Sequence, residues 1–309
     1  MSTKRYRCGI LATCCLPWNE DFTFAEEIFR RQVRRLIAQG IRDLYIFGTA
    51  GEGYAVTDRQ FDEITRVFLD ETHIDGVQTM VGVISLSLGS VIERIQMARA
   101  RGARRFQLTL PSWGALDDAE LEVFFRETCG RFPDCEFLHY NLQRAQRLIT
   151  PSEYGRLADR HPNLVATKNS TADVQRLTAL LSEAPQLQHF ITEIGFAVAA
   201  MRGQCGLLIS LASTNLANGR AYFRAGQEQN GPLLTEMQRE LTRMLEDLMR
   251  VVGPTAHMDG AFDKCFCRLH DADFPLRLLP PYAAAGEDAA EQFKKLLFEA
   301  YPRWAPHGG

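Results

Sequence analysis

The chain has 309 residues, 46% of them hydrophobic, which is an ordinary composition for a globular enzyme. Its formal net charge of −3 at pH 7 argues against bulk attraction to nucleic acid or to an anionic membrane, so neither is expected as a partner. No run of about 18 uninterrupted apolar residues is present, which argues against a membrane-spanning helix. Residues 17–19 interrupt the short apolar run near the start, which argues against a secretory signal. We therefore expect a cytoplasmic protein.

Apolar, β-rich runs recur every few tens of residues along the chain. Most of them are almost continuously apolar, which is the pattern of strands buried on both faces of a parallel sheet. They cover residues 8–16, 43–48, 78–84, 105–111, 136–141, 164–169, 188–193 and 205–210.

The segments between these runs have helical patterns. Residues 24–39 carry apolar side chains at near-helical spacing and stop at Gly40, and Thr57, Asp117 and Pro151 stand at typical helix starts. Eight strands alternating with helices predict an α/β fold of the (β/α)8 TIM-barrel type. No GxGxxG motif joins a strand to a helix, which disfavours a dinucleotide-binding sheet.

The strand pattern ends after residue 215. Residues 217–250 and 286–301 have helical patterns instead. We therefore expect a barrel domain over residues 1–215 and a C-terminal helical region over residues 216–309 that completes and flanks the barrel.

Lys168 occupies an unusual place for a lysine in this sequence. The chain has five lysines among its 35 basic residues, and the other four lie toward its ends. Lys168 stands near the end of an apolar strand, where barrels of this type concentrate their chemistry. Two interpretations of Lys168 are open from its position alone. In the first, the aliphatic part of the side chain is packed and the ammonium reaches water. In the second, desolvation lowers the pKa of the amine and makes it a nucleophile toward a carbonyl carbon.

Two other strand ends carry polar or glycine-rich sequence. The segment GTAGEG at 48–53 allows either a tight loop or a close backbone approach to an anion. Tyr140 ends the run at 136–141 and is either a packed ring with a bonded hydroxyl or part of a site. His139 should point to the opposite face, so we expect it to be a packing residue.

The cysteines do not predict a metal site or a disulfide. Cys14 and Cys15 are adjacent, and Cys265 and Cys267 are separated by one residue. Neither pair has the spacing of a zinc or redox motif, so no metal is expected.

Four stretches together make the chain resemble the dihydrodipicolinate synthase and N-acetylneuraminate lyase family of class I aldolases. GILATCCLPWNEDFTF resembles the family's opening strand and "TPF" turn, and GTAGEGYAVTDRQ resembles its "GTTGE…LT" signature. YN at 140–141 resembles the tyrosine strand, and ATKNST resembles the "GIKDSS" lysine motif. The resemblance covers nearly the whole chain, and it is more specific for the family than for a substrate.

The resemblance implies roles for individual residues. Lys168 matches the lysine that forms a Schiff base with pyruvate or another 2-oxo acid, and Tyr140 matches the acid–base tyrosine. Thr49 and Ala50, with Gly48 before them, match the loop that holds the substrate carboxylate. The resemblance also implies that no cofactor is needed and that the protein is a homo-oligomer, a tetramer or a dimer.

The chain departs from the family pattern at the second-substrate side. Ala50 replaces a hydroxyl residue, and Trp113 stands where dihydrodipicolinate synthases have a relay tyrosine. Ala145 replaces the arginine that receives a second carboxylate, while Arg144 lies one residue away. The eighth-strand segment is longer than usual, and Ser210 is our candidate contact there.

Three functions follow as hypotheses. The first is a dihydrodipicolinate synthase-like, Schiff-base-forming lyase or aldolase acting on pyruvate or another 2-oxo acid, with dihydrodipicolinate synthase proper as an alternative. The second is a dehydratase of a 2-oxo sugar acid that uses the same imine. The third is a keto-acid-binding protein without turnover, because the relay tyrosine and the arginine are both missing.

Overall fold

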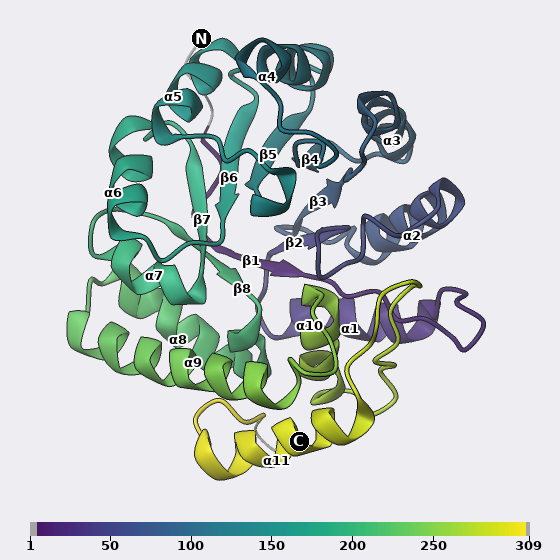
Figure 1. The fold of residues 1–309 in the computed structure, drawn as a ribbon, viewed down its shortest axis with the longest axis vertical. Coiled ribbons are helices and arrows are strands. Elements are labelled where there is room, and N and C mark those ends of the chain that lie inside the picture. The colour runs from purple at the N-terminus through teal and green to yellow at the C-terminus, as the bar shows by residue number, and fades with distance from the viewer. Residues whose placement is uncertain (1–4, 307–309) are drawn as a thin grey trace.

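A closed barrel of eight parallel strands forms the centre of the protein, and helices surround it (Figure 1). The computed structural model describes residues 5–306. Strand order around the barrel follows chain order, with β8 pairing back to β1, which confirms the predicted TIM barrel. The strands are Ile10–Thr13 (β1), Asp43–Ile46 (β2), Gln78–Gly82 (β3), Arg105–Leu108 (β4), Glu136–Asn141 (β5), Leu164–Asn169 (β6), Gln188–Thr192 (β7) and Gly206–Ile209 (β8).

Each strand is followed by a helix that begins where the sequence provides a cap or a turn. Thr57, Asp117 and Thr150 cap their helices with reciprocal side-chain and backbone hydrogen bonds, and Pro151 occupies the first turn of its helix. These helices are Glu26–Ala38 (α1), Asp58–Glu71 (α2), Leu88–Ala100 (α3), Asp118–Phe125 (α4), Pro151–Arg160 (α5), Val174–Glu183 (α6), Glu193–Ala200 (α7) and Leu216–Gln227 (α8).

Three further helices follow the barrel: Gly231–Val251 (α9), Asp259–Arg268 (α10) and Glu287–Ala300 (α11). The segment expected as one helix over 217–250 is two helices, because residues 228–230 break it before Pro232 starts the second. Helix α10 was not expected from the sequence. Helix α9 packs against α7 and α8, and α11 packs against α9 (Figure 1). The domain division at residue 215 stays a prediction.

The interior of the barrel is a small core separate from the larger one between strands and helices. It contains side chains that alternate inward along the strands, such as Tyr45, Leu138 and Ala166. Above this layer the strands β5 and β6 place Tyr140 directly beside Lys168 in register. The outward-facing His139 instead contacts the Tyr154 hydroxyl of α5 at 2.7 Å, which confirms its packing role.

Among residues 5–306, no helix is both long and apolar enough to span a membrane.

Candidate active site at the carboxyl end of the barrel

Lys168 lies at the centre of the site, with its side chain almost completely removed from water. Only 4% of the residue is exposed. Its Nζ donates a hydrogen bond to the Tyr45 hydroxyl at 2.9 Å and lies 3.8 Å from the centre of the Tyr140 ring. Within the described part of the chain it forms no ion pair. Burial lowers the pKa of Lys168 to about 8, against the opposing effect of Asp259 and Asp263. The ammonium therefore does not reach bulk water, and a large fraction of the amine is neutral near pH 8.

Tyr140 is the second aromatic neighbour of this amine, and the centre of its ring lies nearer to Nζ than the centre of the Tyr45 ring does. It is 3% exposed and belongs to β5, whose register sets it opposite Lys168. Burial raises the pKa of its phenol, and the Asp259 carboxylate adds to this effect. The hydroxyl is therefore protonated at neutral pH and able to donate a proton.

The glycine-rich loop after β2 is folded tightly under the site. A Cβ at Gly48 would approach the Tyr45 ring to 2.6 Å, so glycine is required for Tyr45 to reach Lys168. Ala50 lines the cavity that contains Lys168, whereas Thr49 lines a neighbouring cavity. The Thr49 hydroxyl is buried beside the Tyr140 hydroxyl, where its hydrogen-bonding contact opposes the rise in the pKa of that phenol.

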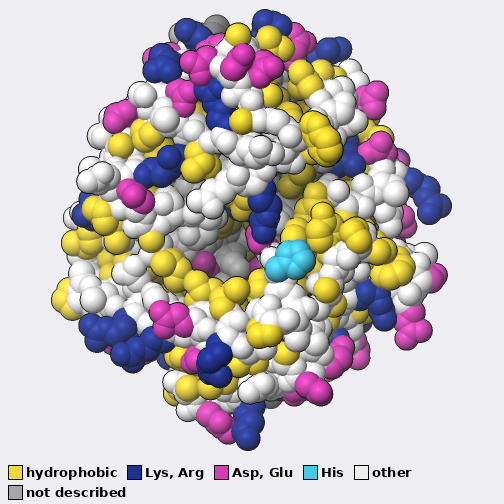
Figure 2. Space-filling view, in the orientation of Figure 1, with side chains coloured by type: hydrophobic (Ala, Val, Ile, Leu, Met, Phe, Trp, Pro, Cys, Tyr) yellow, Lys and Arg dark blue, Asp and Glu magenta, His cyan; other side chains and the backbone are white. Residues whose placement is uncertain are grey.

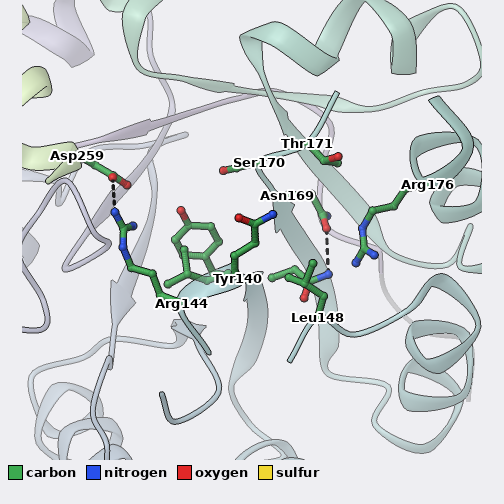
Figure 3. A pocket seen from close by; sticks show the side chains of 11 residues that line it. Tyr140, Arg144, Leu148, Asn169, Ser170, Thr171, Arg176 and Asp259 are labelled. Carbon is green, nitrogen blue, oxygen red and sulfur yellow. Dashed lines mark hydrogen bonds and ion pairs between the residues drawn. The ribbon is translucent and has the colours of Figure 1, made fainter. Parts of the chain in front are cut away.

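Two adjoining cavities lie at this end of the barrel, and Lys168 lines one of them. This inner cavity, of 190 Å³, is also lined by apolar side chains of α9 and α10. The outer cavity, of 380 Å³, is polar and opens at the hollow on the face shown in Figure 2. Both are lined by Tyr140, Ser170 and Asp259 (Figure 3). A substrate bound at Lys168 therefore has room to extend from the inner cavity into the outer one, past the residues that the two share.

Arg144 reaches the outer cavity although Ala145 replaces the family's arginine. Its guanidinium lies 3.2 Å from the Asp259 carboxylate, across the cavity from the strand end (Figure 3). Ala145 is buried, because residues 143–145 form a single turn of 3-10 helix that turns this position inward and its neighbour outward. Arg144, one residue before the position of the family's arginine, therefore places a guanidinium at the mouth of the site.

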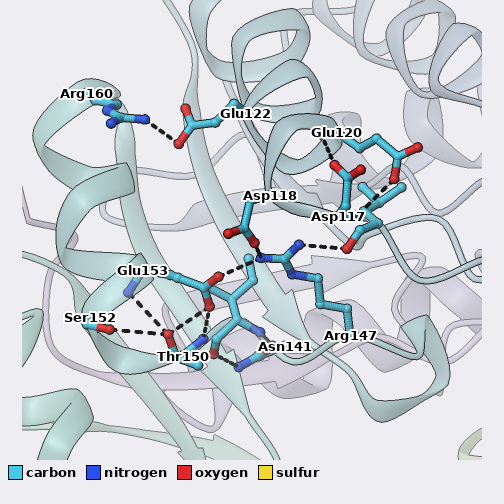
Figure 4. A network of polar contacts seen from close by, with 12 residues as sticks. Asp117, Asp118, Glu120, Glu122, Asn141, Arg147, Thr150, Ser152, Glu153 and Arg160 are labelled. Atoms are coloured by element: carbon cyan, nitrogen blue, oxygen red, sulfur yellow. Dashed lines mark hydrogen bonds and ion pairs between the residues drawn. The ribbon is translucent and has the colours of Figure 1, made fainter.

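A polar network holds the loop that carries Arg144. Asn141 hydrogen-bonds both the N–H and the carbonyl of Ile149, closing the loop at its base. Arg147 contacts the carboxylates of Asp118 and Glu153, each at 2.6 Å (Figure 4). The loop is therefore anchored to the starts of both α4 and α5.

Ser210 lines the inner cavity, as expected, but Trp113 lies away from both cavities. The Ser210 hydroxyl donates to Asp263 at 3.0 Å, and its backbone N–H donates to Glu193. Trp113 is 86% exposed at the tip of the loop after β4, and Gln146 approaches its backbone carbonyl. Trp113 aligns with the family's relay tyrosine, but its indole does not reach the cavities of the same chain, because this loop faces solvent.

Three residues that line the cavity at Lys168 were not expected from the sequence: Tyr45, Asp259 and Asp263. Tyr45 carries a hydroxyl between the apolar residues Leu44 and Ile46 of β2, a signal that was present in DLYIFG. Asp259 and Asp263 are spaced by four, which places them on one side of α10, but no apolar periodicity marked this helix. Their partner Lys168 lies about 90 residues earlier in the chain, so their role required the folded structure.

Residues 7–298 match the Dihydrodipicolinate synthetase family. The chain is 31% identical over 160 residues to a 4-hydroxy-tetrahydrodipicolinate synthase of Thermus thermophilus, covering 52% of this chain and 53% of that protein. It is 27% identical over 170 residues to a "Probable 5-dehydro-4-deoxyglucarate dehydratase" of Pseudarthrobacter chlorophenolicus, covering 54% and 53%. These matches span about half the length of the curated relatives.

The fold extends the similarity over the whole chain. The crystal structure of YagE, a prophage protein of the dihydrodipicolinic acid synthase family from E. coli K12 in complex with pyruvate, superposes with a TM-score of 0.83. It is 18% identical, and the alignment covers 94% of this chain and 98% of that one. The protein belongs to the dihydrodipicolinate synthetase family, as its four motifs predicted.

Proposed function

We propose that this protein is a Schiff-base-forming lyase or aldolase that acts on pyruvate or another 2-oxo acid through Lys168. The observation that carries the proposal is a buried lysine without an ion-pair partner among the described residues, at the carboxyl end of a barrel strand and against two tyrosines. A lysine in this environment has the lowered pKa that a nucleophilic amine needs.

The arrangement supports a sequence of steps. The neutral amine of Lys168 adds to the C2 carbonyl, and loss of water leaves an iminium. The hydroxyl of Tyr140 moves protons at the substrate, and the iminium accepts the electron pair when the C3–C4 bond breaks. Protonation of the resulting enamine and hydrolysis by water then release the product and restore the amine. Backbone N–H groups at Thr49 and Ala50 and the Thr49 hydroxyl are suited to the substrate carboxylate.

The names of the relatives define two reaction types to be separated. One set of relatives is named as synthases and another as dehydratases of a deoxy sugar diacid. Both would begin with the same imine, so product analysis by mass spectrometry must separate C–C bond cleavage from loss of water. A protein that forms the imine but releases no product from any 2-oxo acid would be a binding protein.

Borohydride reduction in the presence of pyruvate tests the proposal. We expect covalent attachment at Lys168, seen as an intact-mass increase and located by peptide mapping. Lys168→Ala should abolish the attachment while the circular dichroism spectrum stays unchanged, because a strand-end alanine opens no large core cavity. Unmodified wild-type protein, or attachment at Lys264, would contradict the mechanism.

We also infer a cytoplasmic homo-oligomer, a dimer or a tetramer. Leu86 and Trp113 support this inference, since both are large apolar side chains exposed by more than half on the loops after β3 and β4. Light scattering coupled to size-exclusion chromatography measures the mass directly, and a monomer at micromolar concentration would contradict the inference.

A further inference from the structure

Asp263 is a buried carboxyl group that faces the reacting lysine from outside the barrel. It lies on α10, is 6% exposed and lines the inner cavity together with Lys168 and Tyr140. The next residue, Lys264, is fully buried and pairs with Glu52 of the loop after β2 at 2.5 Å. This pair fixes α10 over the mouth of the barrel, so Asp263 is held in place.

No cation neutralises Asp263 at ion-pair distance anywhere in residues 5–306. The Asp263 carboxyl accepts a hydrogen bond from the Ser210 hydroxyl at 3.0 Å. A carboxylate buried with so little compensation is costly, and such groups take up a proton instead. Burial raises the pKa of Asp263 to about 8, with Asp259 and Glu193 adding to the effect and Ser210 and Lys168 opposing it.

The other titratable groups around Asp263 come from several elements. One turn earlier on the same helix is Asp259, and two residues later is Cys265; the remaining groups are Lys168 of β6, Tyr45 of β2, Glu193 of α7 and Cys15 after β1. Among these groups Lys168 is the positively charged one. The cavity therefore contains an amine and a carboxyl group whose pKa values are both about 8.

We propose that Asp263 supplies the proton for imine formation and then acts as the counter-ion of the iminium on Lys168. This inference rests on the proposed function. It goes further by assigning a charge-balancing role to a residue outside the barrel strands and outside the motifs that identify the family.

The step conserves charge inside the cavity. The neutral Lys168 amine adds to C2 of the 2-oxo acid, and the C2–O bond of the resulting carbinolamine then breaks. The oxygen leaves as water with one proton that originates from the Asp263 carboxyl. A neutral amine and a neutral carboxyl thus become an iminium and a carboxylate, and hydrolysis of the imine returns the proton. Because no net charge is created in a water-poor cavity, the desolvation cost of the iminium is offset.

Asp263→Asn tests the role, because the amide keeps the shape and can still accept from Ser210. The measurement is the rate of borohydride trapping with pyruvate between pH 6 and 10. We expect a bell-shaped profile for the wild type, with the acid limb set by Lys168 and the alkaline limb by Asp263. In the variant the alkaline limb should disappear, the acid limb should move to lower pH, and the rate at pH 7 should fall by roughly 10²-fold. The exposed Asp273→Asn is the matched control.

Ser210→Ala provides a second variant that leaves the carboxyl in place. Removing the hydroxyl takes away a hydrogen bond to the charged form, so the pKa of Asp263 should rise and the alkaline limb should move to higher pH. A wild-type protein that traps no pyruvate would overturn the proposed function itself. A trapped wild type whose two limbs stay unchanged in both variants would overturn only the role of Asp263, since a purely structural effect lowers the rate equally at every pH.

Discussion

At the scale of the single residue, burial lowers the pKa of the Lys168 amine. No arginine or second lysine among residues 5–306 lies against it to repel its proton; the groups that surround it are two phenols and two carboxyls. The carboxyls oppose the lowering of its pKa, so desolvation is the cause that dominates. A protein that buries an ammonium in this way gives up stability for reactivity.

Replacing Lys168 with methionine should therefore stabilise the protein and abolish imine trapping. Burial lowers the pKa of Lys168 from 10.5 to about 8. The unfolded chain binds more protons between these values, so the destabilising contribution is complete below pH 8 and disappears as the pH rises toward about 10. Urea denaturation should show a gain at pH 7 of up to about 3 kcal/mol that shrinks by pH 10.

The exposed Lys294→Met is the control for this change and should alter stability little at either pH. A Lys168→Met protein that is less stable than the wild type at pH 7 would show that the ammonium is better solvated than its burial indicates.

Tyr140→Phe separates imine formation from later proton transfer. The variant should still be trapped by borohydride with pyruvate, because the amine remains neutral in part and Asp263 remains. Its kcat should fall by roughly 10²–10⁴-fold, the usual contribution of a positioned acid–base group. Tyr154→Phe is the matched control, since this tyrosine is equally buried but bonds His139 on the outer side of the barrel. Steady-state turnover of the Tyr140 variant at the wild-type rate would reduce Tyr140 to a packing residue.

At the scale of elements, α10 is connected to the barrel by one buried ion pair. Lys264 and Glu52 are both fully buried, and Glu52 also accepts from the indole N–H of Trp18 and the backbone N–H of Leu279. The pair therefore joins the loop after β2, the segment after β1 and the C-terminal region. Through α10 it positions Asp259 and Asp263 over the site.

Lys264→Met should cost about 3–5 kcal/mol of unfolding free energy, because Glu52 is left as a buried charge without its cation. The midpoint of urea denaturation measures the loss. Combining Lys264→Met with Glu52→Gln should recover part of it, since the second change removes the uncompensated charge. A double variant less stable than Lys264→Met alone would mean that Glu52 is held mainly by its other hydrogen bonds.

At the scale of the whole molecule, the C-terminal helices and the β5 loop together decide what can reach Lys168. Arg144 stands at the outer cavity but is already paired with Asp259, so an incoming carboxylate must compete for it. The inner cavity is lined on the side of α9 and α10 by apolar side chains, which suits a less polar substrate. Both features disfavour a small acidic aldehyde as the second substrate.

We therefore expect weak dihydrodipicolinate synthase activity in a coupled assay with pyruvate and aspartate semialdehyde. The value of kcat/KM should lie below about 10⁴ M⁻¹s⁻¹, under the usual enzymatic range, and longer 2-oxo acids should react faster. Arg144→Ala is the informative companion variant. A value at or above this limit that falls in Arg144→Ala would show that Arg144 has replaced the missing arginine.

The sequence by itself determined the barrel and the family, and it indicated two candidate site residues. Eight buried apolar runs can be read from local composition, because strands covered on both faces need nearly continuous apolar sequence. Lys168 and Tyr140 stood out for the same local reason, since each is a polar residue at the end of such a run.

Only the tertiary structure decided which other side chains meet the lysine. Tyr45 reaches it because the barrel closes, and Asp263 reaches it because a buried ion pair fixes α10 across the mouth. Arg144 points toward the cavity because the 3-10 turn of residues 143–145 exposes Arg144 and buries Ala145. Contacts between residues so distant in the chain leave no local pattern, because they depend on how completed elements pack and not on the sequence around either partner.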